Sequence, residues 1–79
     1  MRVKDMKITQ FLTVEKLIKI AETANKFESD IHIVGKNFKV DAKSLMGLLA
    51  TLRHETDVTI MTKGEDEEEA IKEFSKLLL

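Results

Sequence analysis

Apolar and polar residues alternate along three segments of the chain, residues 3–9, 30–40 and 57–63. An alternation of period two is typical of β-strands that bury one face. Within the middle segment, the sequence GKN at residues 35–37 favours a turn, because glycine and asparagine tolerate a positive φ angle. The pattern therefore predicts four strands, of which the second and third form a hairpin over residues 31–40.

Three other segments have the apolar spacing of α-helices. The first follows Thr13, a good N-cap, and the last follows Asp66 and Glu69, which form the D-x-x-E pattern of a capping box. Between them, a short helix over residues 44–52 is apolar on more than one face. The first helix is predicted to bury Val14, Leu17, Ile18, Ala21 and Ala24, with Ile20 and Phe27 widening the stripe. The last helix is predicted to bury Ala70, Ile71, Phe74, Leu77 and Leu78.

The predicted order of elements is β-α-β-β-α-β-α. Helices at this spacing cross one face of a sheet and leave the other exposed, which makes an α+β fold: a two-layer open-faced β-sandwich, with a four-stranded antiparallel sheet and three helices on one face. A chain of 79 residues supplies one domain, residues 1–79. The predicted core consists of Met6, Ile8, Leu17, Ala21, Ile31, Ile33, Val40, Leu48, Val58, Ile60, Ile71 and Phe74.

Composition narrows the classes of function. The net charge is −1 and both signs are interspersed, which argues against nucleic acid as the main partner. The absence of cysteine excludes disulfides and thiolate metal sites. The charged N-terminal segment does not resemble a signal peptide and no apolar run is long enough for a membrane span, so a cytoplasmic location without membrane contact is expected.

The acidic run at residues 65–69 has two interpretations. Consecutive acids on a helix point in different directions and do not converge on one ion, so no metal or cofactor is predicted. Acids at the start of a helix and lysines after them instead complement the helix dipole. A solvated helix start is the preferred interpretation.

Three stretches, TANKFESDIHI, KSLMGLL and VTIMTKGEDEEEAI, together with the predicted order of elements, resemble the histidine-containing phosphocarrier protein HPr of the bacterial sugar phosphotransferase system. The first corresponds to the end of the family's first helix and its second strand. The second resembles the K-S-I-M-G-V-M segment around the family's regulatory serine, and the third resembles the last strand, the glycine and the acidic start of the last helix. The resemblance covers nearly the whole chain.

The family's other landmark is missing. HPr carries its phosphoryl group on a histidine in the motif G-I-H-A-R-P-A, and the matching stretch here is FLTVEKL. The histidine position is occupied by Thr13, the arginine position by Glu15, the proline position by Lys16 and the glycine position by Phe11. Thr13 has no visible neighbouring base to activate its hydroxyl, and Glu15 would repel a phosphoryl group. The chain is therefore predicted not to be a histidine phosphocarrier, and no other catalytic set of an enzyme is apparent.

Two histidines remain in the sequence. His32 alternates with Ile31 and Ile33, which predicts a solvent-facing position on its strand. His54 lies between the short helix and the last strand, and in an HPr-like topology its loop would end near Thr13. A displaced phosphoryl-accepting role for His54 is conceivable, and a loop histidine without special partners is the simpler interpretation.

The resemblance gives Ser44 a regulatory role. As an N-cap, Ser44 would satisfy N–H groups of the short helix and stabilise it by about 1 kcal/mol. In the family this serine is phosphorylated by an ATP-dependent kinase, and the phosphorylated protein binds a LacI-type regulator of carbon catabolite repression. A branch of the family lacks the active histidine and keeps this serine, which is the arrangement seen here. The resemblance also implies a partner-binding surface at Lys43, Leu45, Met46 and Leu49.

Three functions stay open on the sequence alone. The first is a regulatory HPr-like protein that is switched at Ser44 and acts by binding other proteins, among them an HPr-type serine kinase and a transcription regulator. The second is an adaptor or homodimer module of the same fold without phosphorylation. The third is an atypical phosphocarrier that uses Thr13 or His54.

Overall fold

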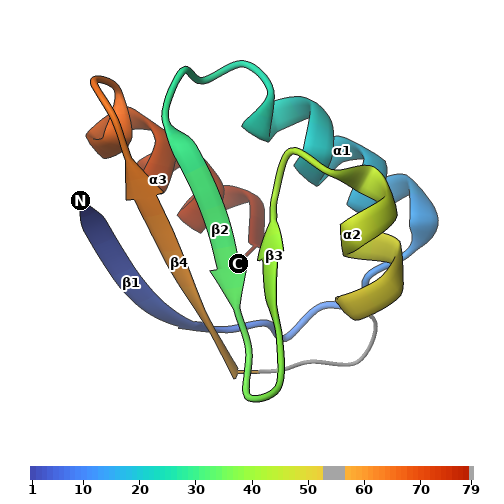
Figure 1. Ribbon diagram of the computed structural model, residues 1–79. Coiled ribbons are helices and arrows are strands. Elements are labelled where there is room, and N and C mark those ends of the chain that lie inside the picture. Colours follow the sequence, from blue (N-terminus) through green and yellow to red (C-terminus); the bar gives the residue numbers. More distant parts are fainter. Residues whose placement is uncertain (53–56, 79) are drawn as a thin grey trace.

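The computed structural model describes residues 1–52 and 57–78 of the chain. They form a single sheet with helices packed on one of its faces, and the other face is open (Figure 1). The elements are β1 (Arg2–Lys7), α1 (Val14–Ala24), β2 (Asp30–Val34), β3 (Lys39–Asp41), α2 (Leu45–Thr51), β4 (Asp57–Lys63) and α3 (Glu67–Leu78). The predicted order, β-α-β-β-α-β-α, is confirmed.

The four strands lie in the order β1-β4-β2-β3, and each neighbouring pair is antiparallel. The register places the apolar positions of different strands opposite one another: Met6 faces Val58, and Ile33 lies between Ile60 and Val40. Because side chains alternate along a strand, this register directs one apolar face of the sheet toward the helices. The α+β open-faced sandwich is therefore confirmed.

The core lies between the sheet and the helices. All of the predicted core residues are buried except Ile71, which is only partly buried at the edge of the cluster. The core also contains Ile20, Ala24, Ala70 and Leu78, as the apolar stripes of the two long helices predicted, together with Leu12, Ala42 and Leu52.

The predicted stripe on α1 is too wide. Leu17, Ile20 and Ala21 are buried, but Val14 is 59% exposed and Ile18 is 38% exposed. A stripe that includes all of these positions spans roughly 160° of the helix circumference at 3.6 residues per turn, and a helix on one side of a two-layer domain buries only the part that faces the sheet. Val14 and Ile18 therefore form an apolar edge of α1 that the fold leaves open.

Two strand boundaries also differ from the prediction. The first strand spans Arg2–Lys7 instead of residues 3–9, and the third spans Lys39–Asp41 instead of residues 38–40. Ile8 stays in the core, at 3% exposure, although it lies beyond the end of β1. Burial therefore continues past the point where the strand ladder stops.

The start of α3 differs in detail from the predicted capping box. The side chain of Asp66 does not act within α3; its carboxylate accepts hydrogen bonds from the backbone N–H groups of Glu28 (3.0 Å) and Ser29 (2.9 Å) and from the Ser29 hydroxyl. The carboxylate of Glu67, the first residue of α3, accepts from the backbone N–H of Gly64 at 3.1 Å and so holds the turn that precedes the helix. The predicted capping box of Asp66 and Glu69 is therefore wrong. Asp66 instead joins the start of α3 to Glu28 and Ser29, in the segment between α1 and β2.

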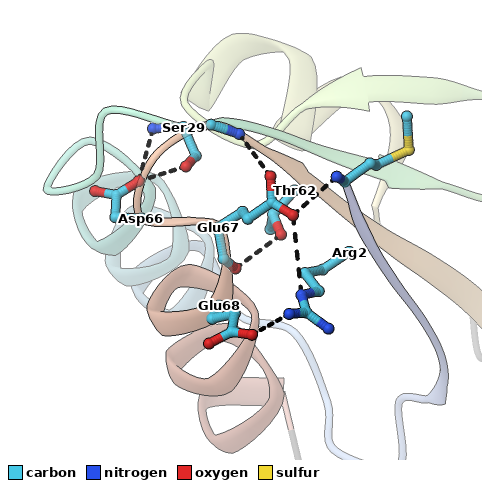
Figure 2. A network of polar contacts seen from close by, with 8 residues as sticks. Arg2, Ser29, Thr62, Asp66, Glu67 and Glu68 are labelled. Carbon is cyan, nitrogen blue, oxygen red and sulfur yellow. Dashed lines mark hydrogen bonds and ion pairs between the residues drawn. The ribbon is translucent and has the colours of Figure 1, made fainter.

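The same acidic run holds the start of the chain (Figure 2). Glu67 forms an ion pair with the N-terminal amine of Met1 at 2.8 Å, and Arg2 approaches both Glu67 and Glu68. The ion pair with the amine, followed by the Gly64 N–H, holds the pKa of the Glu67 carboxyl below its usual range. The acids at the head of α3 thus fasten β1 beside α3. In the described residues, no helix is long and apolar enough to cross a membrane.

Candidate functional site

Ser44 is the N-cap of α2. Its backbone is extended (φ −98°, ψ 104°), and its hydroxyl oxygen accepts a hydrogen bond from the backbone N–H of Gly47 at 3.2 Å. The backbone N–H of Ser44 donates to the carbonyl of Asp41 at 3.0 Å, which ties the cap to the end of β3. Ser44 is exposed, so its hydroxyl is both a helix cap and accessible from solvent.

The segment before Ser44 is held by the end of α1. The side-chain amide of Asn25, the C-cap of α1, donates to the carbonyl of Ala21 at 2.8 Å and to the carbonyl of Lys43 at 3.1 Å. The ammonium group of Lys43 donates to the carbonyl of Phe27 at 2.8 Å. The ammonium group of Lys43 is therefore bound within the fold, and it anchors the segment that leads to Ser44.

Gly47 brings the first turn of α2 against the sheet. A Cβ atom at this position would lie 2.7 Å from Cγ2 of Val40 and 3.3 Å from Oγ of Ser44. A side chain would therefore push α2 away from β3 and crowd the cap. The glycine in KSLMG has a packing reason, which is to keep Ser44 and its helix close to Val40.

The apolar residues of α2 divide between core and surface. Leu48 is fully buried, and Leu45 and Leu49 are partly buried against the core. Met46 is 83% exposed. Met46 lies two residues after Ser44, so the first turn of α2 carries both an uncovered thioether side chain and an exposed hydroxyl.

More exposed apolar side chains come from α1 and its approach. Phe11 is 75% exposed, and it is followed by the exposed Val14 and Ile18. Since α1 and α2 contact each other, we name these three residues together with Met46 the α1–α2 apolar set. Exposed apolar side chains on two helices that contact each other make this side of the protein a candidate protein-binding surface.

Thr13 is the N-cap of α1, and its hydroxyl oxygen accepts a hydrogen bond from the backbone N–H of Lys16 at 3.1 Å. Both Thr13 and Glu15 are exposed, and Glu15 is the acid of the first helical turn. Among the described residues, no basic side chain forms a hydrogen bond with the Thr13 hydroxyl. The site is thus a helix cap with an anion beside it, which suits a structural role better than phosphoryl transfer.

Thr13 and Ser44 are not brought together. Ser44 lies near the end of α1 that carries Asn25, and Thr13 lies at the other end of this helix. The 11 residues of α1 span roughly 16 Å at 1.5 Å per residue. Any role of one hydroxyl is therefore independent of direct contact with the other.

Of the two histidines, the structure describes only His32. His54 lies outside the described residues, and the prediction about it stays untested. His32 is half-buried on β2, opposite Asp41 of β3 and Met61 of β4. In the described part of the chain, no group of three or more His, Asp or Glu side chains has an arrangement that could hold a metal ion.

Sequence reasoning missed two kinds of contributor to this region. Asn25 and Phe27 position Lys43, and the only signal for them was the tendency of asparagine to end helices. Phe11, Val14 and Ile18 supply exposed apolar surface, and their signal was an apolar stripe wider than one helix face can bury.

Comparison with known proteins places the chain in one family. Residues 16–79 match the family described as "PTS HPr component phosphorylation site". The match begins after Thr13. The HPr-like protein Crh of Bacillus subtilis (strain 168) is 40% identical over 55 residues, which cover 68% of this chain and 65% of that protein. The chain thus spans just under two thirds of this relative. Crh of Halalkalibacterium halodurans is 33% identical over 69 residues, which cover 86% of this chain and 82% of that protein.

Solved structures agree with this assignment. HPr from Thermoanaerobacter tengcongensis superimposes with a TM-score of 0.91 at 33% identity, and the match covers 99% of this chain and 91% of the other. Crh of Bacillus subtilis, described as a catabolite repression protein that forms a domain-swapped, intertwined dimer, superimposes with a TM-score of 0.75 at 32% identity, over 92% of this chain and 82% of the other. The chain is therefore a member of the HPr family.

Proposed function

We propose that this HPr-family protein is a regulatory binding protein, switched by phosphorylation of Ser44, and that it does not carry phosphoryl groups on histidine. The observation that carries the proposal is that the first turn of α2 holds both the exposed Ser44 hydroxyl, at its N-cap, and the 83% exposed Met46. A modifiable hydroxyl next to an uncovered apolar side chain combines a switch and a docking residue in one place.

The proposed reaction transfers the γ-phosphoryl group of ATP to the Ser44 hydroxyl. The Ser44 oxygen attacks the γ-phosphorus of ATP, the bond from this phosphorus to the bridging oxygen of ADP breaks, and the hydroxyl proton passes to a base of the kinase. The product has about two additional negative charges at pH 7. Since Ser44 is exposed and outside the core, the phosphate can be accommodated without repacking the protein.

Phosphorylation is expected to change partner choice. The phosphate oxygens would lie beside Met46, while Lys43 stays on the carbonyl of Phe27. A partner surface that offers an arginine next to an apolar pocket would be favoured, because arginine binds phosphate through two parallel hydrogen bonds. The family resemblance suggests a transcription regulator of carbon catabolite repression as that partner.

The test uses an HPr-type serine kinase with ATP on the full chain. Mass spectrometry should show one added phosphoryl group, and Ser44→Ala should abolish it. Thr13→Ala is the matched control, because Thr13 is also an exposed N-cap hydroxyl that accepts from the N–H three residues later. Both variants lose a cap worth about 1 kcal/mol, but only Ser44→Ala should lose phosphorylation.

A second candidate function is a constitutive adaptor or homodimer. The observation in its favour is the α1–α2 apolar set, which is exposed whether or not Ser44 is modified. If a competent kinase leaves the chain unmodified while Met46→Ala weakens self-association in sedimentation equilibrium, this function replaces the first. If the chain is phosphorylated and the phosphorylated form changes its partner, the switch is correct.

A further inference from the structure

A shallow groove lies between the edge of the sheet and the last helix. It has a volume of about 400 Å³ and is lined by residues 2–4 of β1 and by Ile71, Lys72, Ser75 and Lys76 of α3. Its lining includes Ile71, the one predicted core residue that the fold leaves only partly buried. The hydroxyl of Ser75 is already used, because it donates to the carbonyl of Ile71 at 2.7 Å. The groove thus offers apolar surface, with lysines around it.

The charge of the groove is positive. Lys4, Lys72 and Lys76 are exposed, and none of them forms an ion pair with another described residue. Arg2 is different, because Glu67 and Glu68 neutralise it at the end of the groove where α3 begins. Three uncompensated lysines therefore surround the apolar contact at Ile71.

The strand that forms one wall is the free edge of the sheet. β1 pairs with β4 on one side only, and Figure 1 shows β1 as the outermost strand. In an antiparallel pair, alternate residues direct their backbone N–H and C=O groups away from the partner strand. β1 therefore presents a row of backbone donors and acceptors next to the groove, as the edge strands that accept an added strand do.

We propose that this groove binds an extended acidic segment of another protein, which adds to β1 as a fifth strand. Its backbone would pair with the free edge of β1. On the side toward α3, an apolar side chain of the bound segment would cover Ile71. Acidic residues two positions before and two positions after this apolar residue would reach Lys4, Lys72 and Lys76. The recognised pattern is acid-x-apolar-x-acid in an extended chain.

Charge complementarity argues for this occupant over a second copy of the chain. The sequence of β1 is RVKDMK, and because Glu67 and Glu68 neutralise Arg2, two uncompensated cations, Lys4 and Lys7, stand against one anion, Asp5. Two β1 strands paired edge to edge would place these cations close together and repel each other. An acidic strand meets the same row of cations with attraction.

The proposed groove is distant from the Ser44 surface in the topology. β1 and β3 are the two opposite edges of the sheet, with α3 against β1 and α2 against β3. One protein could therefore hold an acidic strand at one edge while a second partner binds near Ser44. The proposal is independent of whether Ser44 is phosphorylated.

The binding test uses the full isotope-labelled chain and a blocked synthetic peptide with the sequence Glu-Thr-Val-Thr-Glu. A heteronuclear NMR titration at low salt should shift resonances of β1 and α3 and leave α2 and β3 unmoved. A peptide with lysine in place of both glutamates should bind at least about tenfold more weakly. A third peptide with alternate backbone amides methylated should also bind weakly, because it cannot complete the ladder.

Variants of the chain locate the site. Lys72→Glu combined with Lys76→Glu should weaken binding by about tenfold or more. Lys39→Glu, an exposed lysine on the opposite edge strand, is the matched control and should leave binding unchanged. If the double reversal disturbs folding, judged by circular dichroism, Lys72→Gln with Lys76→Gln should give a smaller loss in the same direction.

The peptide and vesicle experiments have outcomes that would overturn the proposal. They are no shifts at β1 and α3 with the glutamate peptide, equal binding of the lysine or methylated peptide, shifts centred on α1 and α2, and tighter binding of anionic phosphatidylglycerol vesicles than of the peptide. A concentration-dependent shift of β1 without any peptide would instead assign this edge to a second copy of the chain.

Discussion

The carboxylate of Asp66 accepts a hydrogen bond from the backbone N–H of Ser29 at 2.9 Å, although the two residues are 37 positions apart. Two more donors, the Ser29 hydroxyl and the Glu28 N–H, reach the same carboxylate. The start of α3 is thereby joined to the segment that leads from α1 into β2 (Figure 2). These hydrogen bonds, that of the Ser29 hydroxyl first, hold the pKa of the Asp66 carboxyl below its usual value of 3.8.

Acid should weaken the protein partly through Asp66. A carboxyl whose pKa is lowered in the folded state contributes stability above its unfolded pKa and loses it as the pH falls through the folded pKa. Urea unfolding should therefore show Asp66→Asn to be less stable than the unchanged chain at neutral pH, with the difference shrinking as the pH falls below 3.8. The control is Asp30→Asn, a neighbouring exposed carboxylate, which should differ little from the unchanged chain at any pH. A constant deficit of Asp66→Asn down to strong acid would contradict the role of its charge.

Gly64 should not tolerate a side chain. Its φ angle is 153°, and a Cβ atom would lie 2.7 Å from the Cα of Ser29 and 2.6 Å from its Oγ. Gly64→Ala should lower the free energy of unfolding by about 1–3 kcal/mol or more, measured by urea denaturation. Adding Ser29→Ala removes the hydroxyl, but the clash with the backbone of residue 29 and the backbone strain at residue 64 stay, so it should not restore stability. Recovery in the double variant would show that only the hydroxyl clash matters.

The fold could be predicted because its signals are local and repeated. The alternation in residues 57–63 and the spacing around Leu17 and Phe74 each identify an element, and the resemblance orders them. What the sequence did not reveal depends on contacts between distant segments. From the sequence, the Asp66 carboxylate fits a local capping box equally well. Only the folded structure, which brings the backbone N–H of Ser29 to this carboxylate, excludes that box.

The surface was harder to predict than the core for a similar reason. An apolar residue on a helix can face the sheet or a partner, and Val14 has the same chemistry in either place. Ser44 as an N-cap was predictable from its position before an apolar run, and the structure confirms the cap. Lys43 was assigned to partner binding, whereas its contact with the carbonyl of Phe27 could not be inferred from sequence separation.

Met46 and Leu48 should separate binding from stability. Met46→Ala removes an 83% exposed side chain and should change the free energy of unfolding by less than about 0.5 kcal/mol. Leu48→Ala removes a fully buried one and should cost about 2–5 kcal/mol. Thermal or urea unfolding measures both. Partner binding or self-association, measured by calorimetry or sedimentation, should be weakened by Met46→Ala in a folded chain, and a large loss of stability in this variant would show that Met46 is structural.

The last prediction concerns Thr13, which the sequence resemblance assigns to the position of the phosphorylated histidine of HPr. Incubation with phosphoenolpyruvate and the first enzyme of the sugar phosphotransferase system should leave the unchanged chain unlabelled. The reason is chemical: Thr13 is a cap that accepts from the N–H of Lys16, and Glu15 places an exposed anion in the same helical turn. Label that is stable in base and lost in acid, mapped to His54, would contradict this and support an atypical phosphocarrier.

Thr13→His alone should restore little transfer, because Glu15 still opposes the incoming phosphoryl charge. Thr13→His with Glu15→Arg should be labelled at least about tenfold faster, since an arginine there adds a charge-assisted contact to the phosphoryl oxygens. Both variants lose the Thr13 cap, so each should be less stable by about 1 kcal/mol, and that loss cannot explain a difference between them. Equal labelling rates for the single and double variants would show that Glu15 is not the obstacle. Phosphorylation of Ser44 by the serine kinase should be unaffected in both, because Ser44 lies at the other end of α1.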